Sequence, residues 1–104
     1  MKHTLLIMTR NERECLPVML PKVDESLFHQ MIILDGSSTD GTTDWAMAQG
    51  YGVLNNVKPE LARGQKKLIY VAPPGFRHAY ISVWPYITGD TVTYWTPDGN
   101  SPPW

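Results

Sequence analysis

The sequence has little of several residue types that would each indicate a class of protein. Its single cysteine, Cys15, excludes a disulfide framework and a cysteine-rich zinc site. Its histidines, His3, His29 and His78, show no metal-ligand spacing, so we assign none of them a metal-binding or catalytic role. The formal net charge of −1 gives no bulk attraction for nucleic acid or for an anionic membrane, so a nucleic-acid partner is not expected.

Long apolar stretches are also missing. The uninterrupted apolar run near the N-terminus is Leu5 to Met8, which is far shorter than a signal-peptide core or a membrane-spanning helix. We therefore expect a cytoplasmic protein with no transmembrane segment in this chain. Of its 104 residues, 42% are hydrophobic and 18% are charged, so we expect one globular domain over residues 1–104.

The first third of the chain carries a clear pattern. The segments Thr4–Met8 and Met31–Leu34 are continuously apolar, which is typical of strands buried on both faces. Between them, apolar residues recur at helical spacing from Leu16 to Val23. A strand, a helix and a second strand of this kind predict a parallel βαβ unit.

The remainder of the chain predicts further alternation of helices and strands. We expect a helix at Gly41–Gln49, a third strand at Tyr51–Leu54, an amphipathic helix at Phe76–Ile87 whose aromatic residues are core, and a fourth strand at Thr91–Trp95. The segment Lys67–Ala72 fits either a strand or a tethered loop. The chain is therefore predicted to be α/β with a mainly parallel sheet.

Polar residues follow three of the expected strands. They are Thr9 to Glu12, Asp35 to Ser38, and Thr96 to Asn100. In an open parallel sheet the carboxyl ends of the strands lie on one edge, and ligands bind in the crevice beyond it. Asp35 ends a buried strand and is followed by small residues that leave room for a ligand, although an aspartate here can also simply cap the following loop.

Four segments, taken in order, resemble the family 2 glycosyltransferases, the group that includes dolichol-phosphate mannose synthase. TRNERECLP (residues 9–17) is similar to the segment after their first strand, and ILDGSSTDGT (residues 33–42) is similar to their second-strand signature. PGFRHAY (residues 74–80) and TGDTVTYWTPDGNSPP (residues 88–103) resemble two later blocks. The second-strand signature is the most specific of the four.

This resemblance implies a three-layer α/β/α Rossmann-like fold of the GT-A type, with sheet order 3-2-1-4. It implies a hexosyltransferase that binds a UDP- or GDP-sugar for transfer to an unknown acceptor, usually with a divalent metal. It also implies roles for individual residues: Thr9, Arg10 and Glu12 in the nucleoside pocket, Asp35 as acceptor for the base or ribose, Arg77 near the diphosphate, and Asp98 as ligand of Mg²⁺ or Mn²⁺.

Two departures from the family pattern bear on activity. Thr96 stands where the family usually has the first acid of an acid–x–acid pair, which weakens the case for a metal. The sequence ends at Trp104, before the stretch that supplies the acceptor site and general base in the family. We therefore expect a truncated, donor-binding half with no assigned catalytic residue. We also expect self-association through the edge strand Thr91–Trp95 and poorly covered tryptophans: Trp84, Trp95 and Trp104.

Alternatives remain open at this stage. The chain could be a non-catalytic nucleotide-binding or oligomerisation module, or an unrelated α/β domain such as a flavodoxin-like receiver. The receiver hypothesis expects a phosphorylatable aspartate after the third strand, which is absent after Tyr51–Leu54. Asp98 also fits an ordinary turn, Arg77 also fits simple solvent exposure, and Asp40 is interpreted as a structural turn and helix-cap residue.

Overall fold

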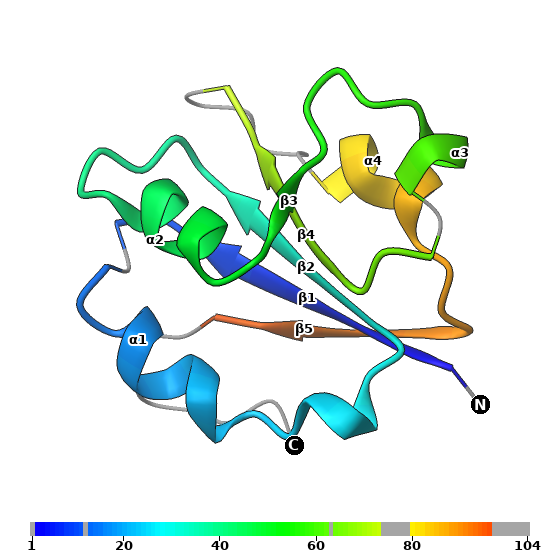
Figure 1. The fold of residues 1–104 in the computed structure, drawn as a ribbon, viewed down its shortest axis with the longest axis horizontal. Coiled ribbons are helices and arrows are strands. Elements are labelled where there is room, and N and C mark those ends of the chain that lie inside the picture. The colour runs from blue at the N-terminus through cyan, green and yellow to red at the C-terminus, as the bar shows by residue number, and fades with distance from the viewer. Residues whose placement is uncertain (1, 12, 63, 74–79, 97–104) are drawn as a thin grey trace.

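The computed structural model describes residues 2–11, 13–62, 64–73 and 80–96. Within these ranges five strands form one sheet in the order β3-β4-β2-β1-β5, and every pair of neighbours is parallel (Figure 1). The strands are β1 (His3–Thr9), β2 (Gln30–Asp35), β3 (Gly52–Val53), β4 (Lys67–Val71) and β5 (Thr91–Trp95). Their carboxyl ends therefore share one edge of the sheet.

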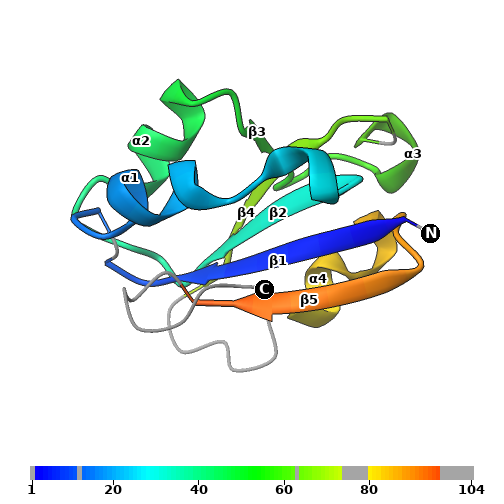
Figure 2. The same cartoon turned by 90° about the horizontal axis from the view of Figure 1, so that it is seen from below.

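Helices lie on both faces of this sheet, as expected for a parallel sheet. On one face the chain forms α1 (Leu16–Met19), the 3-10 turns η1 (Leu20–Lys22) and η2 (Glu25–Leu27), and α2 (Thr42–Ala48). On the other it forms α3 (Pro59–Ala62), α4 (Tyr80–Val83) and the 3-10 turn η3 (Trp84–Tyr86). Figure 2 shows α1 and α2 on the side of the sheet opposite α4. The α/β class is confirmed, and the arrangement is consistent with a Rossmann-like fold.

Two hydrophobic clusters form the core, one on each face. Alternate residues of β1 and β2 enter opposite clusters, which explains why both strands are continuously apolar. The α1/α2 face holds the cluster of Leu5, Ile7, Leu16, Leu20, Val23, Phe28, Met31, Ile33, Ala46, Tyr51, Ile69 and Trp95. The α3/α4 face holds Leu6, Ile32, Leu34, Leu54, Ala62, Leu68, Ala72 and Val83.

The neighbour of β2 differs from the sequence-based expectation. On the side of β2 away from β1, the neighbouring strand is β4, with Ile32 opposite Leu68. The expected neighbour there was the third strand, Tyr51–Leu54. That segment contributes only β3, two residues at the outer edge. A central position requires burial on both faces, which Leu68 and Ile69 provide at 1% and 0% exposure. The four expected strands keep their relative order, but β4 is inserted between the expected third strand and β2, so the predicted sheet order 3-2-1-4 was wrong at this point.

The helices are shorter than their apolar spacing predicted. The expected helix Leu16–Val23 passes from α1 into a 3-10 turn at Leu20, and α4 passes into one at Trp84. A proline follows each of these two residues, and proline cannot donate the amide hydrogen bond that continues an α-helix. The part of the expected helix from residues 76 to 79 lies outside the described residues.

The tryptophans also differ from expectation. Trp84 was expected in the core as an aromatic residue of the amphipathic helix, and separately to be poorly covered; it is 61% exposed, so the first prediction was wrong and the second is confirmed. Trp95 was expected to be poorly covered, yet it is 4% exposed and belongs to the cluster on the α1/α2 face. The end of α4 turns into η3 before Trp84 can face the sheet, whereas the parallel register with β1 holds Trp95 beside Ile7. Trp104 lies outside the described residues.

Candidate functional site

The loops that follow β1 and β2 meet at the carboxyl edge of the sheet. Thr9 and Asp35 are the last paired residues of these two strands. The Gly36 amide donates a hydrogen bond to the Thr9 carbonyl at 2.9 Å, which continues the pairing one residue beyond the strands. Both loops therefore start from a fixed and shared position.

Asp35 is the centre of this edge. Its carboxylate is fully buried and accepts hydrogen bonds from four donors: the Thr9 hydroxyl at 2.6 Å, the Ser38 hydroxyl at 2.6 Å, the Ser38 amide at 2.9 Å and the Thr43 hydroxyl at 3.3 Å. A carboxylate offers about four acceptor positions, so this one is fully used. Asp35 thereby joins the end of β1, the loop after β2 and the first turn of α2.

A second group of contacts links the two loops farther from the sheet. The Asn11 amide donates to the Ser38 hydroxyl oxygen at 2.8 Å, and the Thr39 amide donates to the Asn11 side-chain oxygen at 2.9 Å. Asn11 and Ser37 both have a positive φ, of 53° and 59°. This backbone conformation is uncommon outside glycine, and asparagine tolerates it better than most residues. The reciprocal hydrogen bonds between the loops hold Asn11 in it.

Asp40 connects the same loops to the start of α2. It accepts hydrogen bonds from the Arg13 amide at 3.0 Å and from the Thr42 amide at 3.1 Å, and also from the Thr42 hydroxyl. Partial desolvation by itself raises the pKa of the Asp40 carboxyl, but the hydrogen bonds from Thr42 and Arg13 outweigh it, so the pKa lies below its ordinary value. These contacts agree with the interpretation of Asp40 as a turn residue, but the expected cap role is wrong, because the N-cap of α2 is Gly41 and no side chain makes a capping bond there.

Arg10 places a positively charged guanidinium at this edge that is not engaged by the described residues. Its side chain is exposed, and a Cβ on Gly36 would lie 3.8 Å from both Cβ and Cδ of Arg10, so the arginine stem lies along the glycine. Within the described ranges no hydrogen bond or ion pair engages its guanidinium. Arg10 follows β1, which lies between β2 and β5 in the sheet. The chain reaches β2 through α1 on one face and reaches β5 through α4 on the other face. This is the topological switch point at which open α/β sheets bind ligands.

Three of the six site residues predicted from the sequence lie together here: Thr9, Arg10 and Asp35. The other three, Glu12, Arg77 and Asp98, lie outside the described residues. Asn11 and Ser38 lie in the polar segments predicted to share this edge but were given no individual role, and Thr43 was not predicted; all three make the connecting hydrogen bonds. For Ser38 a signal was present, because an aspartate followed three residues later by serine is a common loop-capping arrangement.

The described part of the chain contains no group of three or more His, Cys, Asp or Glu side chains that could hold a metal ion. It also contains no helix of the length and apolar character needed to cross a membrane. Comparison with protein-family models and with curated proteins finds no match for this chain.

Proposed function

We propose that the chain binds a nucleotide-diphosphate sugar, as the donor-binding part of a GT-A-type glycosyltransferase. The observation that carries this proposal is the joining of the β1 and β2 loops around Asp35, beside β1, the strand at which the connections change faces. The segment 33–42, which most resembles the family 2 signature, supplies the β2 side of this junction. A nucleotide bound there would lie across two rigidly connected loops.

The charges of this edge suit a diphosphate. The guanidinium of Arg10 offers a planar fork of donors that matches phosphate oxygens, and it extends from a position fixed by β1 and Gly36. The nearby carboxylates of Asp35 and Asp40 are engaged by protein donors, which reduces their tendency to draw Arg10 into an ion pair. Arg77 is proposed as a second cation for the diphosphate, and Thr9 and Glu12 as residues of the nucleoside pocket.

Contact between Asp35 and the nucleotide carries a geometric condition. All four acceptor positions of its carboxylate are occupied, so a donor on the base or ribose must displace one of the existing donors. The Thr43 hydroxyl makes the longest of these bonds, at 3.3 Å, and its side chain is half-buried. We propose that the nucleotide donor replaces this hydroxyl, while Thr9 and Ser38 keep the carboxylate in place.

The metal part of the proposal rests on Asp98. A single carboxylate binds a hard divalent cation weakly, so Mg²⁺ or Mn²⁺ should bind tightly only when diphosphate oxygens complete its coordination. Titration of Mn²⁺ with and without UDP checks this, with Asp98→Ala as the variant. Tight Mn²⁺ binding without nucleotide, or unchanged binding in Asp98→Ala with nucleotide present, would contradict the role of Asp98.

Calorimetric titration with UDP and GDP tests the nucleotide site. Asp35→Asn should weaken binding by about 1.5–3 kcal/mol, the range for a hydrogen bond to a charged group, and Arg10→Ala should weaken it similarly. Thr43→Val should leave the affinity unchanged or raise it, because the displaced hydroxyl is then absent. Lys58→Ala, which removes an exposed cation elsewhere, is the matched control. Equal affinities for the wild type and Asp35→Asn, in samples of equal folded fraction, would refute the assignment.

A second candidate function is a non-catalytic module that self-associates. Among the described residues, β5 pairs only with β1 and so forms an edge of the sheet. Tyr94 on β5 is 53% exposed, and on α4 and η3 Ile81 and Trp84 are 58% and 61% exposed. Edge strands and exposed apolar residues favour pairing with another copy. A dimer on sizing at micromolar concentration that Tyr94→Lys converts to a monomer, without any effect on UDP binding, would favour this function.

A further inference from the structure

The loop after β1 is bonded to the loop after β2 at three alternate residues. These bonds join Thr9 to Gly36 at 2.9 Å, Asn11 to Ser38 at 2.8 Å and Arg13 to Asp40 at 3.0 Å. Each bond uses a backbone group of the first loop, so the backbone itself is held. Arg10 lies between the first two of these residues, and the chain is therefore fixed on both sides of it.

Asn11 is held through its side chain as well as through its backbone. Its side-chain oxygen accepts a hydrogen bond from the Thr39 amide at 2.9 Å. Its φ of 53° lies in the left-handed region, which is unfavourable for most L-residues and which asparagine tolerates better than most. The bond to Thr39 therefore stabilises, directly after Arg10, a backbone conformation that a chain seldom adopts.

The stem of Arg10 is guided by the second loop. A Cβ on Gly36 would lie 3.8 Å from both the Cβ and the Cδ of Arg10, so the stem passes along a residue that has no side chain to obstruct it. A free arginine side chain has many rotamers, and ordering it on a ligand costs conformational entropy. A backbone fixed on both sides of Arg10 and a stem that lies along Gly36 reduce this cost, because fewer directions remain open to the guanidinium.

We propose that Asn11 is a positioning residue for Arg10: its bond to Thr39 holds the backbone conformation that directs the Arg10 guanidinium toward the diphosphate of a bound nucleotide. This inference rests on the proposed function and deepens it. Asn11 acts here through Arg10 and not through contact with the ligand. Its removal should therefore weaken the binding of a nucleoside diphosphate and leave the binding of a nucleoside unchanged.

Titration of ¹⁵N-labelled Asn11→Gly with UDP and with uridine tests the ligand part of the proposal. Glycine adopts a positive φ without strain and keeps the amide that donates to Ser38, so this variant removes only the side-chain bonds to Thr39. It should bind UDP about fivefold more weakly, the factor for one net hydrogen bond, and should bind uridine as the wild type does. In an Arg10→Ala background Asn11→Gly should have no further effect on UDP binding. Equal losses for UDP and uridine, or the same loss with and without Arg10, would show a general structural role and would overturn the proposal.

Backbone ¹⁵N relaxation without any ligand tests the positioning by itself. The heteronuclear NOE of the Arg10 amide should be lower in Asn11→Gly than in the wild type. Asn11→Asp, which keeps the acceptor for Thr39 and also tolerates the positive φ, should restore the wild-type value. Equal values in the wild type and Asn11→Gly would overturn the proposal whether or not a nucleotide binds. A wild type that binds neither UDP nor GDP would instead refute the proposed function, and with it the diphosphate part of this inference, while the relaxation data would still decide whether Asn11 orders Arg10.

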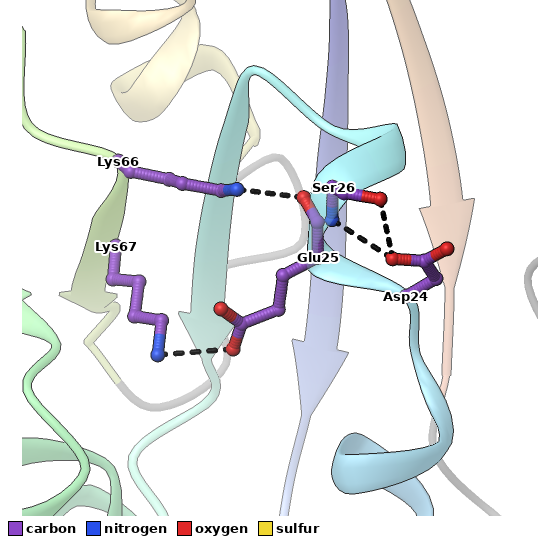
Figure 3. A network of polar contacts seen from close by, with 5 residues as sticks. All are labelled: Asp24, Glu25, Ser26, Lys66 and Lys67. Atoms are coloured by element: carbon purple, nitrogen blue, oxygen red, sulfur yellow. Dashed lines mark hydrogen bonds and ion pairs between the residues drawn. The ribbon is translucent and has the colours of Figure 1, made fainter.

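Asp24→Gly is the matched control, because the Asp24 side chain likewise accepts a hydrogen bond from an exposed amide, that of Ser26, at 3.0 Å (Figure 3). Asp24 precedes η2, which leads into the amino end of β2, so it lies away from the carboxyl edge of the sheet. The ion pair between Lys67 and Glu25, at 3.0 Å, also holds η2, so the turn should persist without Asp24. The control should match the wild type in UDP binding and in relaxation. A loss of UDP affinity as large as that of Asn11→Gly would overturn the proposal.

Discussion

Removing the Asp35 carboxylate should destabilise the fold itself, apart from any effect on a ligand. Asp35→Ala leaves four donors without their acceptor. Two of these donors have no easy alternative, because Thr9 is only 5% exposed and the Ser38 amide is fixed by the backbone. A hydrogen bond to a charged group contributes about 1.5–3 kcal/mol, so losing two at the lower value lowers the free energy of unfolding by about 3 kcal/mol.

Asp35→Asn should be much milder. The asparagine side chain keeps one oxygen, which can accept from the Ser38 amide, and presents an NH₂ group in place of the other oxygen. The hydroxyls of Thr9 and Ser38 can each rotate to accept from that group, since a hydroxyl is both donor and acceptor. We therefore expect a loss of about 1 kcal/mol, which reflects weaker bonds in place of missing ones.

Urea unfolding followed by tryptophan fluorescence measures these differences, because Trp95 is buried in the native state. A double-mutant cycle of Asp35→Asn with Thr9→Val should give a coupling energy of about 1 kcal/mol, since the two side chains share a bond. If Asp35→Ala does not fold, the cycle still tests the network. An unfolding free energy of Asp35→Ala within about 0.5 kcal/mol of the wild type, the size of an ordinary surface effect, would refute the reasoning.

Two further predictions concern other parts of the fold. Because the pKa of Asp40 in the folded state lies below the ordinary value of 3.8, its ionised form adds stability above that value, and this stability is lost as the pH falls through the folded pKa. Asp40→Asn should therefore be less stable than the wild type near neutral pH, and the difference should shrink in acid; a difference independent of pH in urea titrations would contradict this. At Gly89, an added Cβ would lie 2.8 Å from the amide nitrogen of buried Thr4, so Gly89→Ala should lower the unfolding free energy by about 1–3 kcal/mol. Gly52→Ala is its control in the same denaturation assay, because its Cβ would lie 3.0 Å from the flexible end of Gln65 and, at 3.9 Å, in ordinary contact with the Lys67 carbonyl oxygen. Equal losses in both variants would count against the steric argument.

The sequence alone was sufficient for the central part of the fold. Two continuously apolar runs with a helical spacing between them predicted β1, α1 and β2, and the structure confirms their parallel pairing. Once the strands are parallel, their carboxyl ends must share an edge, so the proximity of Thr9 and Asp35 could also be expected. Both inferences start from the local spacing of apolar residues, which can be read within a short stretch of sequence.

Tertiary structure decided which segment pairs with which. Whether Tyr51–Leu54 or Lys67–Val71 lies beside β2 depends on which can be buried on both faces, and that depends on side chains elsewhere in the chain. In the same way, an amphipathic spacing could not reveal that α4 ends before Trp84 reaches the sheet. Periodicity records which residues tend to be buried, but it does not record the partner that buries them.

The details of the sites depended on tertiary structure for the same reason. The acceptor role of Asp35 joins Thr9 to a residue 26 positions away, and the Asn11 bond to Ser38 spans 27 positions. The sequence fixes which donors and acceptors the chain carries, whereas only the packing of distant segments decides which of them find a partner.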